Sequence, residues 1–355
     1  MDYLIPVGVA IVLGPLSLIT MIRATMPKAP KTPEAMKEVV MNFVKQGYLL
    51  IRMNRKPKPG ESMHNFQSAL GLCYETYDPD RLTVSKNFLS YRYKLAPSDK
   101  LTPGLGTALM DEVTAGLMGA AGKPAGASLF FQTQWYPENI KSSTSADDDD
   151  EDYLDIINTL TKNGRTISHT RTDIRSSDNK LIGYSTHVKY MPFGNIMMDT
   201  LISYFPMWMS PWVSGIINKQ LPPPSPTAHE NIGAHKAVDS GLKIVSDGKG
   251  EFSMTDDHKN PFGTLHGGCT AMIMEKVGES YANSLFKDSK FYLESLQVQF
   301  LSAGRGQKIL TIESETIEFT ENNHALIRVK LMKPNSGKKK GPTVLAEGTL
   351  RYLVK

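Results

Sequence analysis

A short segment beginning at residue 260 carries the side chains of this chain that are best suited to chemistry. It runs from Asn260 to Gly268, with the sequence NPFGTLHGG, and leads into a helix-like stretch from Cys269 to Leu285. A glycine pair at a helix start leaves amide N–H groups that, with the helix dipole, stabilise negative charge on a carbonyl oxygen. Asn260 and His266 can orient a substrate, and Glu275 supplies a carboxylate base. The set suits attack of water on a thioester.

These residues resemble the motif of the hotdog-fold acyl-CoA thioesterases, the 4-hydroxybenzoyl-CoA and phenylacetyl-CoA type. That motif is an Asn, then Gly-x-x-His-Gly-Gly, then an Asp or Glu on a long central helix. The resemblance runs from Ser240 to Val354 and implies an antiparallel sheet wrapped around that helix. A fold does not fix an activity, so the residues have to carry the functional argument. The matching positions are Asn260, Gly263, His266, Gly267, Gly268 and Glu275.

The composition is that of an ordinary globular protein with room for two domains, 355 residues at 40% hydrophobic content. The net charge is +4, and the basic residues are scattered without interleaved aromatics, so no nucleic-acid surface is predicted. The two cysteines, Cys73 and Cys269, give no disulfide framework. We interpret Cys269 as a small buried residue, because no base is evident that would make it a nucleophile. No metal or cofactor is expected, with a CoA thioester entering only as substrate.

The N-terminal segment predicts a retained membrane anchor. Residues 3–22 contain no charged side chain, and about 20 helical residues span roughly the 30 Å of a bilayer core. Basic residues follow, beginning at Arg23, which places the remaining chain on the cytosolic or mitochondrial matrix side. A cleaved signal peptide is the alternative, but Asp2 stands where a basic residue is usual. We expect residues 1–31 to be a single-pass transmembrane helix with its juxtamembrane segment.

A weak internal repeat relates the two halves of the chain. Each half has a hairpin-like pair before a central helix and four strand-like runs after it. We therefore predict an α+β protein of two fused hotdog domains, 61–193 with a degenerate motif and 237–355 with an intact one, joined edge to edge. The alternative is an unrelated α+β domain in the first half. With Glu275 placed over Asp111, the further identities are Leu101 with Leu265, Gly104 with Gly268, and Val113 with Val277.

Two further segments connect these domains to the rest of the chain. Residues 32–60 are predicted to form an amphipathic helix, because Met36, Val40 and Phe43 recur on one side. Residues 194–236 are predicted to be an apolar connector followed by a proline-rich linker. The apolar part is expected to lie on a bilayer surface or on a partner.

The resemblance implies a site between two domains, with the Asn, His and first Gly from one and the carboxylate from the other. The second half keeps Asn260, His266 and Gly267, and the first half keeps the carboxylate, Asp111. We expect Gly267 N–H to polarise the thioester carbonyl and Asp111 to act as general base or nucleophile. Asn260 is expected to position water or substrate, His266 to hold the loop and thioester, and Ser128 to orient the water.

The opposite pairing is expected to be silent. There Glu275 faces Thr102 and Pro103, and proline has no N–H to offer an oxyanion. Gly268 is a candidate substrate-binding residue beside the working site. Lys338, Lys339 and Lys340 are candidates for the phosphates of CoA, with a solvated basic loop as the alternative.

Two functions from different classes follow. The first is acyl-CoA hydrolysis at one composite site of a membrane-anchored protein. The second is a catalytically inactive accessory or scaffold subunit of a membrane complex, such as one in the mitochondrial inner membrane. Its partners would be other subunits or a second copy of this chain. A hotdog dehydratase is a poorer option, because its usual histidine motif is not recognisable here.

Overall fold

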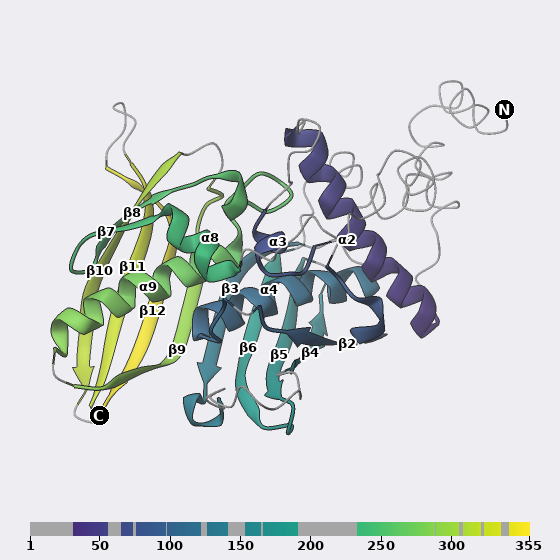
Figure 1. Ribbon diagram of the computed structural model, residues 1–355, viewed down its shortest axis with the longest axis horizontal. Coiled ribbons are helices and arrows are strands. Elements are labelled where there is room, and N and C mark those ends of the chain that lie inside the picture. Colours follow the sequence, from purple (N-terminus) through teal and green to yellow (C-terminus); the bar gives the residue numbers. More distant parts are fainter. Residues whose placement is uncertain are drawn as a thin grey trace.

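The protein contains a twelve-stranded antiparallel sheet with long helices packed on one face, as Figure 1 shows for a computed structural model. The strand order is β1-β2-β4-β5-β6-β3-β9-β12-β11-β10-β8-β7. The α+β class with an antiparallel sheet is therefore confirmed. The structure describes residues 31–55, 65–73, 76–96, 98–121, 126–140, 153–164, 166–190, 233–287, 289–304, 308–320, 323–334 and 341–355.

The strands and the long central helix follow the same order in each half, while the shorter helices differ. The first half has α2 (Pro33–Arg55), α3 (Phe66–Ala69), η1 (Pro79–Arg81), β1 (Leu82–Ser85), β2 (Phe88–Lys94), α4 (Pro103–Ala120), β3 (Ala127–Trp135), η2 (Pro137–Asn139), β4 (Tyr153–Asn163), β5 (Ile167–Ser176) and β6 (Leu181–Tyr190). The second has α8 (Ala234–Gly241), β7 (Leu242–Ser246), β8 (Lys249–Ser253), η4 (Asp256–His258), α9 (Gly267–Leu285), β9 (Phe291–Phe300), β10 (Ile309–Thr320), β11 (His324–Lys333) and β12 (Thr343–Val354).

The two halves of the sheet are mirror images in strand order. Read from its outer edge, the first half runs β1-β2-β4-β5-β6-β3, and the second runs β7-β8-β10-β11-β12-β9. They meet at β3 and β9, which pair antiparallel with Gln132 opposite Gln297. An antiparallel joint of this kind relates the halves by an approximate twofold axis. The joint also leaves neither β3 nor β9 as an exposed sheet edge.

The central helices begin where their capping residues allow. Thr102 caps α4 by accepting from Leu105 N at 3.3 Å, and His266 caps α9 by accepting from Gly268 N at 3.0 Å. Side chains that accept from the first free N–H groups fix a helix start. The expectation that the second helix begins at Cys269 is wrong by two residues, because the His266 cap lets the helix include both glycines.

The two central helices lie unusually close where they meet. A Cβ atom added to Gly268 would lie 2.5 Å from Cα of Ala108, and one added to Gly104 would lie 3.0 Å from Cα of Met272. Only a residue without a side chain permits such an approach. This contact sets the N-terminus of each helix against the body of the other, which positions the candidate site.

Helix α2 covers the outer side of α4 (Figure 1). Met36 and Val40 are buried there, and Gly116 of α4 leaves the space that Val40 fills. The amphipathic helix expected within residues 32–60 is therefore present as Pro33–Arg55. The linker was expected to reach residue 236, but α8 already begins at Ala234. The helix begins there because Asp99 accepts hydrogen bonds from the backbone N–H groups of Ala234 and His235.

Several predicted segments lie outside the described residues. They are the membrane anchor at 3–22, the apolar connector up to residue 232, and the basic run at 338–340. Among the residues that the structure does describe, no helix combines the length and apolar character needed to cross a bilayer.

Candidate functional site

Asp111 lies at the N-terminus of the opposite half's central helix. Its side chain projects from α4, is only 7% exposed, and faces the first turn of α9. A Cβ atom on Gly267 would lie 2.7 Å from Asp111 Oδ2, and His266 Nδ1 lies 3.8 Å from the same oxygen. Residues that are more than 150 positions apart in sequence therefore form one cluster.

The other carboxylate oxygen of Asp111 is held by the sheet beneath it. Ser128 of β3 donates its hydroxyl to Oδ1 at 3.1 Å, and Lys189 Nζ of β6 lies 3.6 Å from Oδ1. His187 Nε2, also from β6, lies 3.9 Å from Oδ1 and 3.1 Å from Ser128 Oγ. Oδ1 is thus fixed by protein groups, while Oδ2 points at the start of α9.

Charged and polar neighbours set the ionisation of Asp111. Burial alone raises the pKa of a carboxyl group, because it penalises the charged form. The ammonium of Lys189 is the largest influence against burial, ahead of His266 and His187, which act through charge only when protonated, and of the hydrogen bond from Ser128. Together these groups leave the pKa of Asp111 below its usual value. Asp111 is therefore a carboxylate at neutral pH.

His187 is buried as a neutral ring. Burial, and then the nearby Lys189 charge, hold the pKa of His187 well below its usual range. Its ring stacks on Phe131 with centroids 3.8 Å apart. Because Ser128 gives its one proton to Asp111, His187 Nε2 must be the donor to Ser128 Oγ. This chain of donors fixes the orientation of the serine hydroxyl.

His266 is oriented by contacts on both sides of its ring. Nδ1 accepts from Gly268 N at 3.0 Å, so the ring proton lies on Nε2, which donates to Glu112 Oε2 at 3.2 Å. Gln67 in turn donates to Glu112, and Phe66 packs on the imidazole with centroids 5.0 Å apart. The histidine is therefore held in one tautomer and one position.

The glycine pair plays two different parts. Gly267 is the first residue of α9, where the backbone N–H has no partner within the helix and lies at the positive end of the dipole. The N–H of Gly268 is already given to His266. Gly267 thus offers the free donor of the cluster, whereas Gly268, predicted to bind substrate, has its N–H occupied and serves the close helix contact.

Asn260 is engaged within its own loop. Its Oδ1 accepts from Phe262 N at 3.0 Å and from Thr264 N at 3.2 Å, and its Nδ2 donates to Thr264 Oγ1 at 2.7 Å. Such contacts let the loop turn at Gly263, whose φ is +75°. The expected role of Asn260 toward water or substrate stays a prediction, and the structure adds a loop-shaping role.

The equivalent end of the molecule, around Glu275, has a different chemistry. Glu275 of α9 is 6% exposed and accepts from Thr102 Oγ1 at 2.7 Å and from the backbone N–H of Gly104. Pro103 occupies the first position of α4, so no free N–H is present there. Burial raises the pKa of Glu275 to about 7. The structure thus brings together the residues predicted for a silent site.

The sheet beneath Glu275 is apolar where the sheet beneath Asp111 is polar. Ser128 and Leu293 each stand four residues before the central pair of the β3–β9 joint. The pairing of β3 with β6 and of β9 with β12 is irregular at the same place in each half, so their neighbours are equivalent too. The equivalent pairs are Ser128 and Leu293, His187 and Leu350, and Lys189 and Tyr352.

Sequence reasoning missed three residues of the Asp111 cluster, namely His187, Lys189 and Glu112. A signal for the first two was present in β6, where Ser185, His187 and Lys189 alternate on one buried side of the strand. Polar residues at consecutive inward positions of a strand indicate a polar site rather than a core. Glu112 carried no comparable signal.

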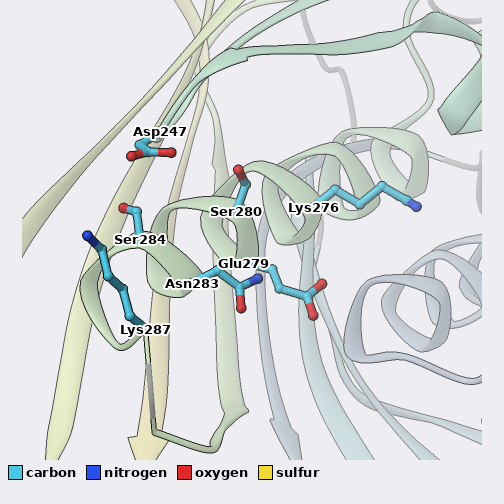
Figure 2. A pocket seen from close by; sticks show the side chains of 7 residues that line it. All are labelled: Asp247, Lys276, Glu279, Ser280, Asn283, Ser284 and Lys287. Atoms are coloured by element: carbon cyan, nitrogen blue, oxygen red, sulfur yellow. The ribbon is translucent and has the colours of Figure 1, made fainter.

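A concave surface elsewhere on the molecule does not hold this cluster. Figure 2 shows it on the outer side of α9, where Lys276 and Lys287 extend in opposite directions along the helix and the polar side chains between them spread apart. Side chains that diverge into solvent do not converge on a ligand. In the described ranges, no group of His, Cys, Asp and Glu side chains is arranged to hold a metal ion.

Comparisons with known proteins agree with the position of the motif. Residues 262–338 match the family model of the Thioesterase superfamily. No curated protein sequence matches the chain.

Solved structures with a similar arrangement include several thioesterases. A putative thioesterase from Novosphingobium aromaticivorans is 14% identical, with a TM-score of 0.45 over 78% of this chain and 98% of that one. A putative oleoyl thioesterase from Lactobacillus plantarum is 10% identical, with a TM-score of 0.47 over 75% and 96%. An acyl-CoA thioesterase II from Mycobacterium marinum is 10% identical, with a TM-score of 0.42 over 82% and 96%. The match to the Thioesterase superfamily therefore concerns residues 262–338, which lie in the second half of the chain.

Proposed function

We propose that this protein hydrolyses acyl thioesters, with acyl-CoA as the substrate class, at one composite site between two fused hotdog domains. The observation that carries the proposal is the position of Asp111 Oδ2 at the N-terminus of α9, beside Gly267 and His266 of the other half. A carboxylate next to a free helix N-terminal amide can supply the base or nucleophile and the oxyanion donor for thioester hydrolysis. The Thioesterase superfamily match over residues 262–338 supports the same reaction.

The roles follow from which groups are free and which are held. The thioester carbonyl oxygen accepts from Gly267 N–H, where the helix dipole stabilises the charge that develops on it. Asp111 Oδ2 either takes a proton from the attacking water or attacks the carbonyl carbon itself. Ser128 keeps Oδ1 in place, and His266 keeps the loop in place. The thiolate of CoA then leaves as the carbonyl forms again. In the water route this releases the carboxylic acid directly, whereas after attack by Asp111 a water molecule must then hydrolyse the acyl–Asp111 anhydride to release the acid and restore the carboxylate.

The context of the site belongs to the same proposal. The two domains are 61–193 and 237–355, and residues 3–22 anchor them to a membrane with both domains on its positive-inside face. The apolar, uncharged sequence of 3–22 supports the anchor. Lys338, Lys339 and Lys340 remain candidates for the CoA phosphates.

The test is hydrolysis of a panel of acyl-CoA thioesters of increasing chain length by the purified full-length chain. Asp111→Asn keeps the size of the side chain and removes its charge, and should lower kcat by about 100-fold or more. The matched variant Glu275→Gln changes the equivalent carboxylate and should leave kcat unchanged. Equal losses in both variants would contradict a single working site. A wild-type protein without turnover on the whole panel would favour the accessory-subunit function.

A further inference from the structure

Lys189 is a buried cation that the proposed reaction has not used. It lies on β6 next to Ser128 of β3, is 4% exposed, and has its Nζ atom 3.6 Å from Asp111 Oδ1. A buried ammonium is costly unless a carboxylate compensates it, and breaking such a pair leaves a charge without a partner. Lys189 and Asp111 therefore depend on each other for burial in ionised form.

The equivalent position in the other half shows what happens without the cation. There Tyr352 replaces Lys189, and its hydroxyl finds no hydrogen-bond partner among the described residues. Glu275, the equivalent carboxyl group, has its pKa raised to about 7, because burial outweighs the hydrogen bonds from Thr102 and Gly104. The contact between the two central helices thus buries Asp111 beside a cation and Glu275 without one.

The other groups that face Asp111 do not replace Lys189. His187 of β6 is neutral, since its pKa is held well below its usual range by burial. Ser128 of β3 contributes only a hydroxyl. From α9, His266 turns an unprotonated Nδ1 toward Asp111 while its Nε2 proton goes to Glu112. The ammonium of Lys189 is accordingly the principal lowering influence on Asp111.

The position of Lys189 also determines which oxygen of Asp111 remains free. It approaches Oδ1, the same oxygen that Ser128 binds, and leaves Oδ2 to face Gly267. We propose that Lys189 is a positioning residue that keeps Asp111 ionised and aims its free oxygen at the thioester, so that the site works at acidic as well as neutral pH. This inference rests on the proposed hydrolysis for its functional part.

The experiment compares three substitutions of Lys189 in the full-length chain. Lys189→Met removes the charge at similar volume, Lys189→Gln removes it with a polar group, and Lys189→Arg keeps it. Tyr352→Phe is the matched control at the equivalent position of the other half. The first readout is the pH profile of kcat/KM. The second is the titration of the Asp111 carboxyl carbon in protein labelled with ¹³C-aspartate, identified as the signal lost in Asp111→Asn.

The neutral variants should behave alike and the charged one like the wild type. In the Met and Gln variants, the titration midpoint of Asp111 and the acid limb of kcat/KM should both move up by at least about one pH unit. At pH values below the limb, each unit of this shift lowers kcat/KM of the variant about tenfold relative to the wild type. At pH 8, where Asp111 is ionised in every variant, the rate should change little, because Ser128 still holds Oδ1. Lys189→Arg and Tyr352→Phe should leave both readouts in place.

The two readouts separate the two proposals. An Asp111 midpoint that stays in place in both neutral variants overturns the role of Lys189, whatever the turnover. A rate that falls equally at all pH values with an unmoved midpoint shows a purely structural lysine and overturns it as well. A wild-type protein that shows no turnover, but whose Asp111 midpoint moves in the neutral variants, refutes hydrolysis and leaves the electrostatic role standing.

Discussion

The Asp111 end and the Glu275 end of this molecule share one backbone arrangement and differ in a few side chains. Both put a carboxyl group of one central helix against the capped N-terminus of the other. One helix begins with Gly267 and the other with Pro103. A single residue at the first helical position therefore decides whether a free amide is present, without changing the fold.

The sheet beneath each end sharpens the contrast. Under Asp111 the neighbours are a hydroxyl, an imidazole and an ammonium, and the pKa of Asp111 is lowered despite burial, chiefly by Lys189. Under Glu275 the equivalent neighbours are apolar or aromatic, and burial raises its pKa to about 7. A buried carboxyl group can therefore be ionised or protonated, and the side chains of the neighbouring strands determine which state it adopts.

The outer sides of the two central helices differ in the opposite sense, because that of α4 is apolar and covered whereas that of α9 is polar. In the first half α2 covers α4, and Val40 fills the space beside Gly116 (Figure 1). In the second half the corresponding side of α9 is polar and open (Figure 2). The offset of 164 residues that places Glu275 over Asp111 pairs Glu112 with Lys276, Val113 with Val277, and Gly116 with Ser280.

The largest effect is expected from making α9 begin as α4 does. Gly267→Pro removes the amide donor, and kcat should fall about 10² to 10³-fold in a steady-state assay. The helix should survive, because proline is favoured at the first helical position. The preceding residue, His266, already has the extended backbone that proline requires, with φ −68° and ψ 137°.

Two controls make that experiment decisive. Gly267→Ala keeps the N–H but adds a Cβ atom 2.7 Å from Asp111 Oδ2, so it measures displacement of the carboxylate alone. Pro103→Gly should leave turnover unchanged, because the apolar surroundings of Glu275 are still in place. An alanine variant as inactive as the proline variant would show that the lost amide is not the cause.

The part of the site that lies within the helices could be predicted from the sequence. Between Thr102 and Asp111, and between His266 and Glu275, the spacing is the same and no insertion intervenes. Helical geometry then fixes which residues face the partner helix. For that reason the sequence alone predicted that Gly267 offers a backbone N–H at the helix start and that Pro103 does not.

The strand contributions were harder to predict, for a physical reason. The pairing of β3 with β6 slips between Ser128 and Phe130, and one residue of slip moves a side chain to the other face of a sheet. Asp111 and Ser128 are 17 positions apart, whereas Glu275 and the equivalent Leu293 are 18 apart, so counting on from the helices left Ser128 one residue out of register. Such counting gave no position for Lys189, which lies on β6, three strands after β3 in the same half.

The next effect is one of stability and depends on pH. The pKa of Glu275 is raised from its usual 4.5 to about 7, so the folded protein holds a proton that the unfolded chain releases between these values. Stability from this group falls as pH rises through that window and stays lower above it. Glu275→Gln should therefore be more stable than the wild type at pH 8, by up to about 3 kcal/mol, and equal to it near pH 4.5.

Thermal unfolding of both proteins across this pH range measures the difference. Asp111→Asn is the opposite control, because the lowered pKa of Asp111 stabilises the folded state above its usual titration range. That variant should lose stability at neutral pH. A Glu275→Gln variant whose stability relative to wild type does not change with pH would mean that Glu275 is ionised in the folded protein.

The smallest effect is expected at Ser128. Ser128→Ala removes the donor to Asp111 Oδ1 and leaves the Nε2 proton of His187 without its acceptor. A hydrogen bond to a charged group contributes about 1.5 to 3 kcal/mol, but Lys189 still holds the same oxygen at 3.6 Å. We therefore expect the lower part of that range, a fall of about tenfold in kcat with KM unchanged.

Ser128→Thr keeps the hydroxyl, and its branched Cβ suits a strand, so it should retain most of the rate. If alanine and threonine lose the same amount, the hydroxyl does not orient Asp111. A loss in the alanine variant comparable to that of Gly267→Pro would mean that the serine acts on the water directly, as the sequence suggested. A small loss of kcat in the alanine variant would mean that Ser128 acts by holding the Asp111 carboxylate. Leu293, the equivalent residue in the other half, cannot make that hydrogen bond.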